Sequence, residues 1–244
     1  MSQSPKVIAV IPARYQSTRF EGKPLALIAG KPMIQRVYEQ VKKCSDISDI
    51  IVATDDQRIQ ATAEAFGATV VMTSSDHESG TDRIAEAVKN FDCDIVVNVQ
   101  GDEPLIEPET IEGVIRPFFN DKTVEMTTSS AVLQEKEEII DPNCVKVVTD
   151  LNNFALYFSR SAIPFDRDDA NPEGAWRLHL GIYGYRKETL LRYSRLSPTP
   201  LERLEKLEQL RALENGIKIF VAQTPYRSIG VDRPEDVQKV EGLL

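Results

Sequence analysis

The feature that most constrains the fold is an alternation of short apolar runs with helical segments over the first hundred residues. Four apolar runs predict buried strands, at residues 6–11, 49–53, 69–72 and 94–99. Helical spacing of apolar residues lies between them, at residues 33–44, 58–66 and 82–88. This alternation predicts a doubly wound, mostly parallel α/β sheet, whose ligands bind beyond the carboxyl ends of its strands.

The pattern changes after about residue 124. Four β-like runs follow with little helix between them, at residues 125–133, 145–150, 154–159 and 178–185. The polar segment 166–174 contains Pro172 and Gly174 and predicts a mobile loop. The last predicted elements are helices at residues 187–193 and 200–214, a strand at 217–222 and a terminal helix opened by Pro234. We therefore predict a single domain over residues 1–244, with a smaller β-rich lobe at about residues 125–190.

Composition and charge exclude several classes of protein. The formal net charge is −9 and no run of five Lys or Arg occurs, whereas nucleic-acid binding usually needs a clustered basic face. No segment approaches the length of a membrane span, and the N-terminal apolar run is too short for a signal sequence. The three cysteines form no CxxC pair, which is typical of free thiols in a reducing cytosol. We expect a cytoplasmic protein that binds neither nucleic acid nor membrane.

The turn after the first predicted strand, residues 12–25, concentrates cations, hydroxyls and a glycine. Arg14 can hold a phosphate through two donors, Lys23 offers a point charge, and backbone N–H groups of such a turn also bind phosphate. The turn matches neither GxxxxGK[ST] nor GxGxxG. A solvated basic loop explains these residues equally well, so spacing alone leaves both interpretations open.

Two carboxylates that follow predicted strands are candidate magnesium ligands, since Mg²⁺ is typically held by one or two carboxylates plus substrate phosphates. Asp102 comes after the strand predicted at residues 94–99, in the turn Gln100-Gly101-Asp102. An exposed turn aspartate is the alternative there. Asp232 stands two residues before Pro234, and its spacing alone favours a helix N-cap.

Two further groups of polar residues are candidates for binding a hydroxyl-rich ligand. His179 and Tyr183 share one face of the strand predicted at residues 178–185, where a core histidine is an equally good explanation. Glu208 and Gln209 flank a stripe of leucines that we expect to face the core, at residues 204, 207, 210 and 213 of the helix predicted at 200–214. Taken alone, Glu208 and Gln209 favour a solvated helix face.

Together these segments resemble the family of 3-deoxy-manno-octulosonate cytidylyltransferases, or CMP-Kdo synthetases. The matching words follow a fixed order along essentially the whole chain: IPARYQSTR, GKPL, GKPMI, VATDD, SGTDR, VNVQGDEP, VKVV, ALYFSR, HLGIYGYR, LEQLR and GVDRPED. The resemblance implies a nucleotide-diphospho-sugar-transferase fold, usually dimeric through the smaller lobe. It also implies a Mg²⁺-dependent reaction of CTP with the acidic eight-carbon sugar Kdo, which gives CMP-Kdo and pyrophosphate for lipopolysaccharide biosynthesis.

The resemblance implies a role for each matching position. Asp102 and Asp232 are expected to hold Mg²⁺, which replaces the N-cap interpretation of Asp232, and with Lys23 and Arg14 they form the expected catalytic set. The triphosphate is assigned to Arg14, Ser17 and Lys23. The cytidine pocket is assigned to Ser79, Gly80 and Arg83. The sugar acid is assigned to Gln100, Arg160, His179, Tyr183, Glu208 and Gln209, with Arg160 expected to pair the carboxylate.

Two departures from the family pattern affect these expectations. Glu21 stands where many members have proline, and we expect it to point away from the phosphate loop. Ser228-Ile229 and Asp232-Arg233-Pro234 resemble a branch that uses 8-amino-Kdo, whereas Gly230 agrees with the ordinary branch. The 8-amino sugar is therefore the alternative acceptor. Transfer to another sugar and a non-catalytic nucleotide-binding regulator are the wider rivals, and the paired carboxylates argue against a regulator.

Overall fold

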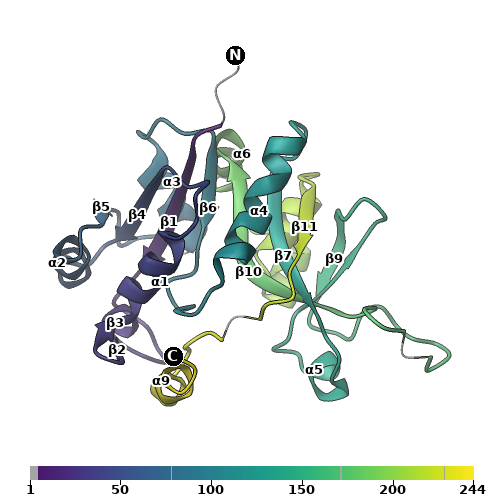
Figure 1. The fold of residues 1–244 in the computed structure, drawn as a ribbon. Coiled ribbons are helices and arrows are strands. Elements are labelled where there is room, and N and C mark those ends of the chain that lie inside the picture. The colour runs from purple at the N-terminus through teal and green to yellow at the C-terminus, as the bar shows by residue number, and fades with distance from the viewer. Residues whose placement is uncertain (1–4, 78, 171, 228) are drawn as a thin grey trace.

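A computed structural model describes residues 5–77, 79–170, 172–227 and 229–244, and in this part of the chain a nine-stranded mixed sheet forms the centre of the molecule (Figure 1). In sheet order the strands are β11 (Ile219–Gln223), β7 (Met126–Val132), β10 (Arg177–Arg186), β6 (Ile95–Asn98), β1 (Val7–Ala13), β4 (Asp49–Thr54) and β5 (Thr69–Met72). Two more, β8 (Lys146–Thr149) and β9 (Ala155–Ser159), continue from β10. The predicted α/β, mostly parallel fold is confirmed.

The parallel half of the sheet explains the apolar runs of the sequence. β1 pairs in parallel with both β4 and β6, so both of its faces are covered. Val7, Ala9 and Ile11 pack into one core, and Ile8 and Val10 pack into the other. Because successive side chains of a strand point to opposite faces, a strand buried on both sides must be apolar at every position.

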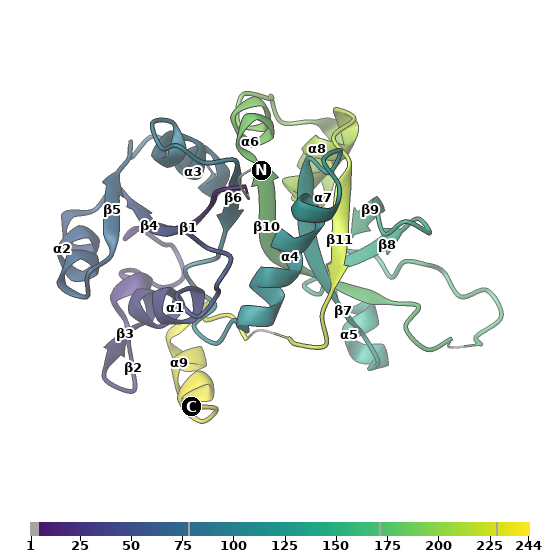
Figure 2. The same cartoon turned by 45° about the horizontal axis from the view of Figure 1, so that its top comes forward.

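Helices cover both faces of the sheet (Figure 2). One core receives apolar side chains from α1 (Met33–Val41), α2 (Gln57–Ala65) and α4 (Pro108–Asn120). The other receives them from α3 (Gly80–Val88), α6 (Lys187–Tyr193) and α8 (Gln209–Glu214). The terminal helix α9 (Pro234–Glu241) packs beside the small β2–β3 ribbon, Leu27–Ile28 with Lys31–Pro32.

The second half of the chain adds the antiparallel part. β10 runs antiparallel to its neighbours β6 and β7, with a register shift between Leu180 and Tyr183, and β11 is parallel to β7. β8 and β9 project at one side together with α5 (Lys136–Ile140), as Figure 2 shows. The segment 166–174 contains neither helix nor strand in its described residues, and Asn171 lies outside them. Its mobility stays a prediction.

The helix predicted at residues 200–214 is wrong in one respect. It is two helices, α7 (Pro200–Glu205) and α8, because Lys206 takes the left-handed conformation at φ 55° and ends α7. Leu204, predicted to belong to the core, is 79% exposed as a result. Two α-helices, α4 and α5, and the short β2–β3 ribbon were not predicted. Within the described residues no helix combines the length and apolar character needed to cross a bilayer.

Candidate active site

A cavity of about 250 Å³ opens where β1, β6 and the start of α3 meet, beyond the carboxyl ends of the two strands. We call it the outer cavity. Its described lining residues are Pro12, Ala13, Arg14, Ser17, Arg19, Lys23, Pro24, His77, Ser79, Gly80, Arg83, Gln100, Gly101 and Asp102. The turns after β1 and β6 touch here, since a Cβ on Gly101 would lie 2.9 Å from the carbonyl oxygen of Pro12. Only glycine allows this approach.

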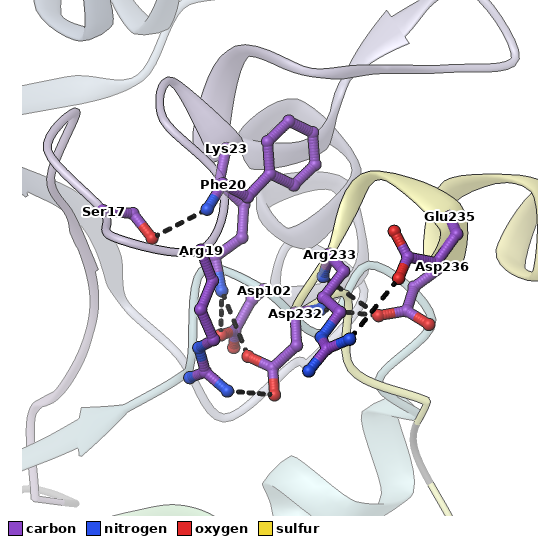
Figure 3. Close-up of polar contacts among 9 residues, drawn as sticks. All are labelled: Ser17, Arg19, Phe20, Lys23, Asp102, Asp232, Arg233, Glu235 and Asp236. Atoms are coloured by element: carbon purple, nitrogen blue, oxygen red, sulfur yellow. Dashed lines mark hydrogen bonds and ion pairs between the residues drawn. The ribbon is translucent and has the colours of Figure 1, made fainter.

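The predicted phosphate turn lines this cavity. Gly22 has φ 69°, a left-handed conformation that suits glycine, and it precedes a short 3-10 turn that begins at Lys23. Ser17 Oγ accepts a hydrogen bond from the Phe20 backbone N–H at 3.3 Å, which closes the turn on itself (Figure 3). Arg14 makes no ion pair with any described residue. Glu21 is exposed and does not line the cavity, as expected.

The structure brings the two candidate metal carboxylates together around one ammonium group (Figure 3). Lys23 Nζ lies 2.6 Å from Asp102 Oδ2 and 3.8 Å from Asp232 Oδ1. Arg19 Nη1 lies 3.1 Å from the other carboxylate oxygen of Asp232. The N-cap interpretation of Asp232 is wrong, because Arg233 is the N-cap residue of α9 and Asp232 turns its carboxylate toward these cations.

Asp102 and Asp232 fit a divalent cation that also binds a substrate. Their oxygens face one point, which the Lys23 ammonium now holds, so this point favours positive charge. Among the described residues no group of three or more His, Cys, Asp or Glu side chains could form a complete metal site. Two carboxylates supplemented by substrate phosphates are a usual ligand set for Mg²⁺.

The start of α3 forms the opposite wall of the outer cavity. Ser79 is the N-cap of α3, and its hydroxyl accepts from the Asp82 backbone N–H at 3.1 Å. Arg83 is 4% exposed, and its guanidinium lies 3.0 Å from Asp55. The predicted cytidine residues Ser79, Gly80 and Arg83 therefore lie together and face the phosphate turn.

A second cavity of about 230 Å³, the inner cavity, continues from the first. Gly80 and Gln100 line both. Gln100 Nε2 donates to the Gly181 carbonyl at 3.0 Å, which fixes its amide at the junction. The other residues of the inner cavity are Thr81, Asn98, Met126, Tyr183, Tyr185, Tyr193, Glu208 and Gln209.

The inner cavity contains polar atoms that have no hydrogen-bond partner in the described part of the chain. They are Asn98 Oδ1, Glu208 Oε1 and Gln209 Nε2, each shielded from solvent. Burial raises the pKa of Glu208, and a hydrogen bond from the Thr81 hydroxyl opposes this shift. The predicted solvated face at Glu208 and Gln209 is wrong, because the break at Lys206 turns both residues inward. Buried polar groups without partners cost free energy, so this cavity favours a polar ligand.

His179 lies beside the inner cavity, behind Tyr183. Its Nε2 is 2.9 Å from the Tyr183 hydroxyl and 3.1 Å from the Thr128 hydroxyl. Burial lowers the pKa of His179 to about 3, so the ring is neutral at ordinary pH. Tyr183 lines the cavity and His179 does not, so His179 orients the tyrosine.

Arg160 lines neither cavity. Its guanidinium donates to the backbone carbonyls of Glu205 at 2.7 Å and Pro142 at 2.9 Å, and its backbone N–H donates to the Glu205 carboxylate. These contacts hold the end of α7, from which the chain turns to Glu208. The assignment of Arg160 to the sugar carboxylate stays a prediction.

Sequence reasoning assigned no role to several residues that line these cavities, among them Arg19, His77 and Asn98. Arg19 stands in the same turn as Lys23 and is also positively charged, so its position in a cluster of cations could have identified it as a phosphate ligand. His77 contacts Glu86 of α3, a contact between segments that spacing does not reveal. Asn98 belongs to the predicted strand and to the matching word VNVQGDEP, but it received no role of its own, although a polar residue at the end of a buried strand is itself a signal.

Comparisons with known proteins agree with this geometry. A family model described as Cytidylyltransferase matches residues 8–219. The chain is 53% identical to the 3-deoxy-manno-octulosonate cytidylyltransferase of Geotalea uraniireducens, over 96% of this chain and 97% of the relative. The corresponding protein of Geobacter sulfurreducens is 51% identical, over 96% and 97%.

Solved structures extend the comparison. A CMP:2-keto-3-deoxy-manno-octonic acid synthetase complexed with CTP superposes with a TM-score of 0.93 at 41% identity, and 98% of each chain is covered. The 4-diphosphocytidyl-2C-methyl-D-erythritol synthase of Anaerococcus prevotii has a TM-score of 0.63 at 14% identity, covering 99% of each chain. This second likeness concerns the fold alone.

Proposed function

The chain belongs to the cytidylyltransferase family, and we propose that it joins CTP to 3-deoxy-manno-octulosonate, giving CMP-Kdo and pyrophosphate for lipopolysaccharide biosynthesis. The observation that carries the proposal is the pair of adjoining cavities. The outer one is rich in cations, and the inner one contains polar atoms that lack partners. Gly80 and Gln100 belong to both, so two substrates bound there meet at their junction.

In the proposed reaction the anomeric hydroxyl of the sugar attacks the α-phosphorus of CTP. A bond forms between that oxygen and phosphorus while the hydroxyl proton passes to water. The bond to the bridging oxygen of the β-phosphate breaks, and pyrophosphate leaves with the electron pair. Such chemistry depends mainly on positioning and on stabilising charge. Arg14 and Lys23 supply cations to the triphosphate, Ser17 supplies a hydroxyl, and Ser79, Gly80 and Arg83 enclose the cytidine.

The family resemblance also implies Mg²⁺, and Asp102 and Asp232 are the residues that would hold it. When bound, the ion would stabilise negative charge on the phosphates and lower the pKa of a hydroxyl that it contacts. Lys23 now neutralises both carboxylates, at 2.6 and 3.8 Å. When the substrate binds, the Lys23 ammonium would exchange its two carboxylate partners for the phosphates of the substrate.

The inner cavity suits the sugar because it offers both hydrogen-bond donors and hydrogen-bond acceptors. Glu208 offers an acceptor and Gln209 a donor, while Tyr183, held by His179, adds a hydroxyl. Burial raises the pKa of Tyr183 and Tyr185 well above the usual value, so both remain neutral. A wall of neutral hydroxyls, an amide and a carboxyl suits a polyol better than a phosphate, which needs cations.

We propose further that the protein works as a homodimer in the cytoplasm, associated through the β-rich lobe. This lobe exposes Ile140 at 71%, Leu156 at 62% and Phe165 at 85%. Large exposed apolar side chains gathered in one part of a protein often mark an interface. The three cysteines carry free thiols, as is usual in a reducing compartment. Light scattering on Leu156→Ser and Phe165→Ser variants tests the interface, since both should shift the protein toward monomer.

The experiment that tests the proposed reaction measures pyrophosphate release from each of the four common ribonucleoside triphosphates with Kdo and with 8-amino-Kdo. We expect release from CTP with Kdo, dependent on Mg²⁺. Release with 8-amino-Kdo alone would make that sugar the acceptor. CTP binding without release for either sugar would favour the nucleotide-binding regulator.

A further inference from the structure

The end of β6 and the turn after it, residues 98–102, run along both cavities. Asn98 lines only the inner cavity, Gln100 lines both, and Asp102 lines only the outer cavity. These three alternate residues therefore trace the path from the proposed sugar to the proposed metal. Gln100 and Asp102 already have assigned roles, whereas Asn98 has none.

Asn98 is a polar residue in an apolar strand. It ends β6, where Ile95, Val96 and Val97 are completely buried. Asn98 is itself only 4% exposed, and its Oδ1 has no hydrogen-bond partner among the described residues. A buried carbonyl oxygen without a partner has lost its hydrogen bonds to water and destabilises the fold. A fold gains nothing from such a group unless another molecule supplies the donor.

From this placement we infer that Asn98 is a specificity-determining residue, whose side-chain carbonyl accepts a hydrogen bond from a hydroxyl of the acceptor sugar. The inference rests on the proposed function. Two of the three partnerless atoms around the cavity are acceptors, on Asn98 and Glu208, and one is a donor, on Gln209. The ligand must therefore present at least two donors and one acceptor here, as neighbouring sugar hydroxyls do.

The chain offers a matched control for this inference. Ser130 of β7 is 1% exposed and its Oγ also lacks a partner, yet it lines neither cavity. If burial without a partner were merely tolerated by the fold, Asn98 and Ser130 would behave alike. If Asn98 serves the sugar, only its replacement changes the kinetics of the acceptor.

The test compares Asn98→Leu, which keeps the size but removes the polar atoms, with Ser130→Ala. Steady-state rates of pyrophosphate release are measured against Kdo and CTP separately, and thermal unfolding is measured without ligand. For Asn98→Leu we expect the KM for Kdo to rise about tenfold or more, the KM for CTP to stay within about twofold, and Tm to be no lower than in the wild type. Ser130→Ala should change neither KM.

Kdo analogues that lack one hydroxyl, at C4, C5, C7 or C8, identify the contact. One of these analogues should bind the wild type more weakly than Kdo does, but it should bind Asn98→Leu no more weakly than Kdo does. A KM for Kdo within twofold of the wild type would overturn the inference. If Asn98→Leu does not fold, Asn98→Ser, which retains an oxygen, is measured against the same analogues, and equal losses for all four would also overturn it. Inactive wild type with Kdo would instead refute the proposed function, so the two failures are distinct.

Discussion

The two cavities differ in whether their polar groups already have partners within the protein. In the outer cavity three of the cations already have partners inside the protein, Lys23 with Asp102, Arg19 with Asp232 and Arg83 with Asp55, and Arg14, which has no ion pair among the described residues, is exposed to solvent. In the inner cavity Asn98, Glu208 and Gln209 each have an atom without a hydrogen-bond partner among the residues that the structure describes. The outer cavity must therefore exchange ion pairs when it binds a ligand, whereas the inner cavity only completes hydrogen bonds.

This difference follows from electrostatics. An isolated buried charge is costly, so a site for charged phosphates must neutralise itself when empty. A neutral amide costs much less to leave unpaired and can be kept ready for a ligand. Substitutions in the outer cavity should therefore affect turnover and the metal, and those in the inner cavity should affect the affinity for the sugar.

The largest expected effect concerns the paired carboxylates. Asp102→Asn and Asp232→Asn should each lower kcat about a hundredfold or more, because each removes a charge that is needed only while charge develops on the phosphates. Turnover is measured at saturating Mg²⁺, CTP and Kdo. Asp56→Asn is the control, because this partly buried N-cap of α2 lies outside both cavities and asparagine also caps helices. Near-normal kcat in either active-site variant would remove that residue from the metal site.

A smaller effect is expected at Lys23. Lys23→Ala should lower kcat/KM for CTP about tenfold to a hundredfold, since the leaving pyrophosphate loses a cation. The KM for Kdo should change much less. Lys31→Ala, which breaks only a surface pair with Glu39, should be silent. A change confined to the KM for Kdo would place the phosphate turn on the wrong substrate.

Arg160 tests whether the inner cavity depends on its support. Its contacts with the end of α7 predict that Arg160→Lys lowers Tm and raises the KM for Kdo a few-fold, because the turn that presents Glu208 loosens. Arg203→Lys, on the exposed side of α7, serves as control.

A methyl ester of Kdo separates this positioning role from direct contact with the sugar carboxylate. If Arg160 only positions the turn, esterification should cost the wild type and the variant equally. A variant indifferent to the ester, with an unchanged Tm, would show that Arg160 binds the carboxylate itself.

The smallest expected effect concerns stability at low pH. The pKa of His179 is lowered to about 3 by burial, below the usual 6.5, so the unfolded chain binds this proton more readily than the folded one. The histidine should therefore destabilise the fold increasingly as pH falls below about 6.5. His179→Gln should lose less Tm than the wild type between pH 7.5 and 5. An equal loss would mean that His179 is not kept neutral in the folded protein.

The sequence predicted the sheet well because a strand buried on both faces needs apolar residues at every position, as in β1. It failed at α4, where Pro117 and polar residues interrupt the periodicity although Ile111, Val114 and Phe118 are buried. It also failed at Lys206, since a left-handed residue inside a helical pattern leaves no signal without a glycine.

The site was predicted in parts. The phosphate turn and Asp102 follow from the position of strand ends. Asp232 required the resemblance, because its local spacing equally describes a helix cap and only the contacts with Lys23 and Arg19 distinguish the two. The inward direction of Glu208 depends on the break at Lys206, which no local pattern predicts.

The division between the two cavities is tested most directly by a crystal structure with Mg²⁺, CTP and a Kdo analogue that lacks the anomeric hydroxyl, so that no transfer occurs. We predict the triphosphate against Arg14, Ser17 and Lys23, and the sugar within hydrogen-bond distance of Asn98, Glu208 and Gln209. Triphosphate in the inner cavity, or a sugar bound away from those three side chains, would contradict the account.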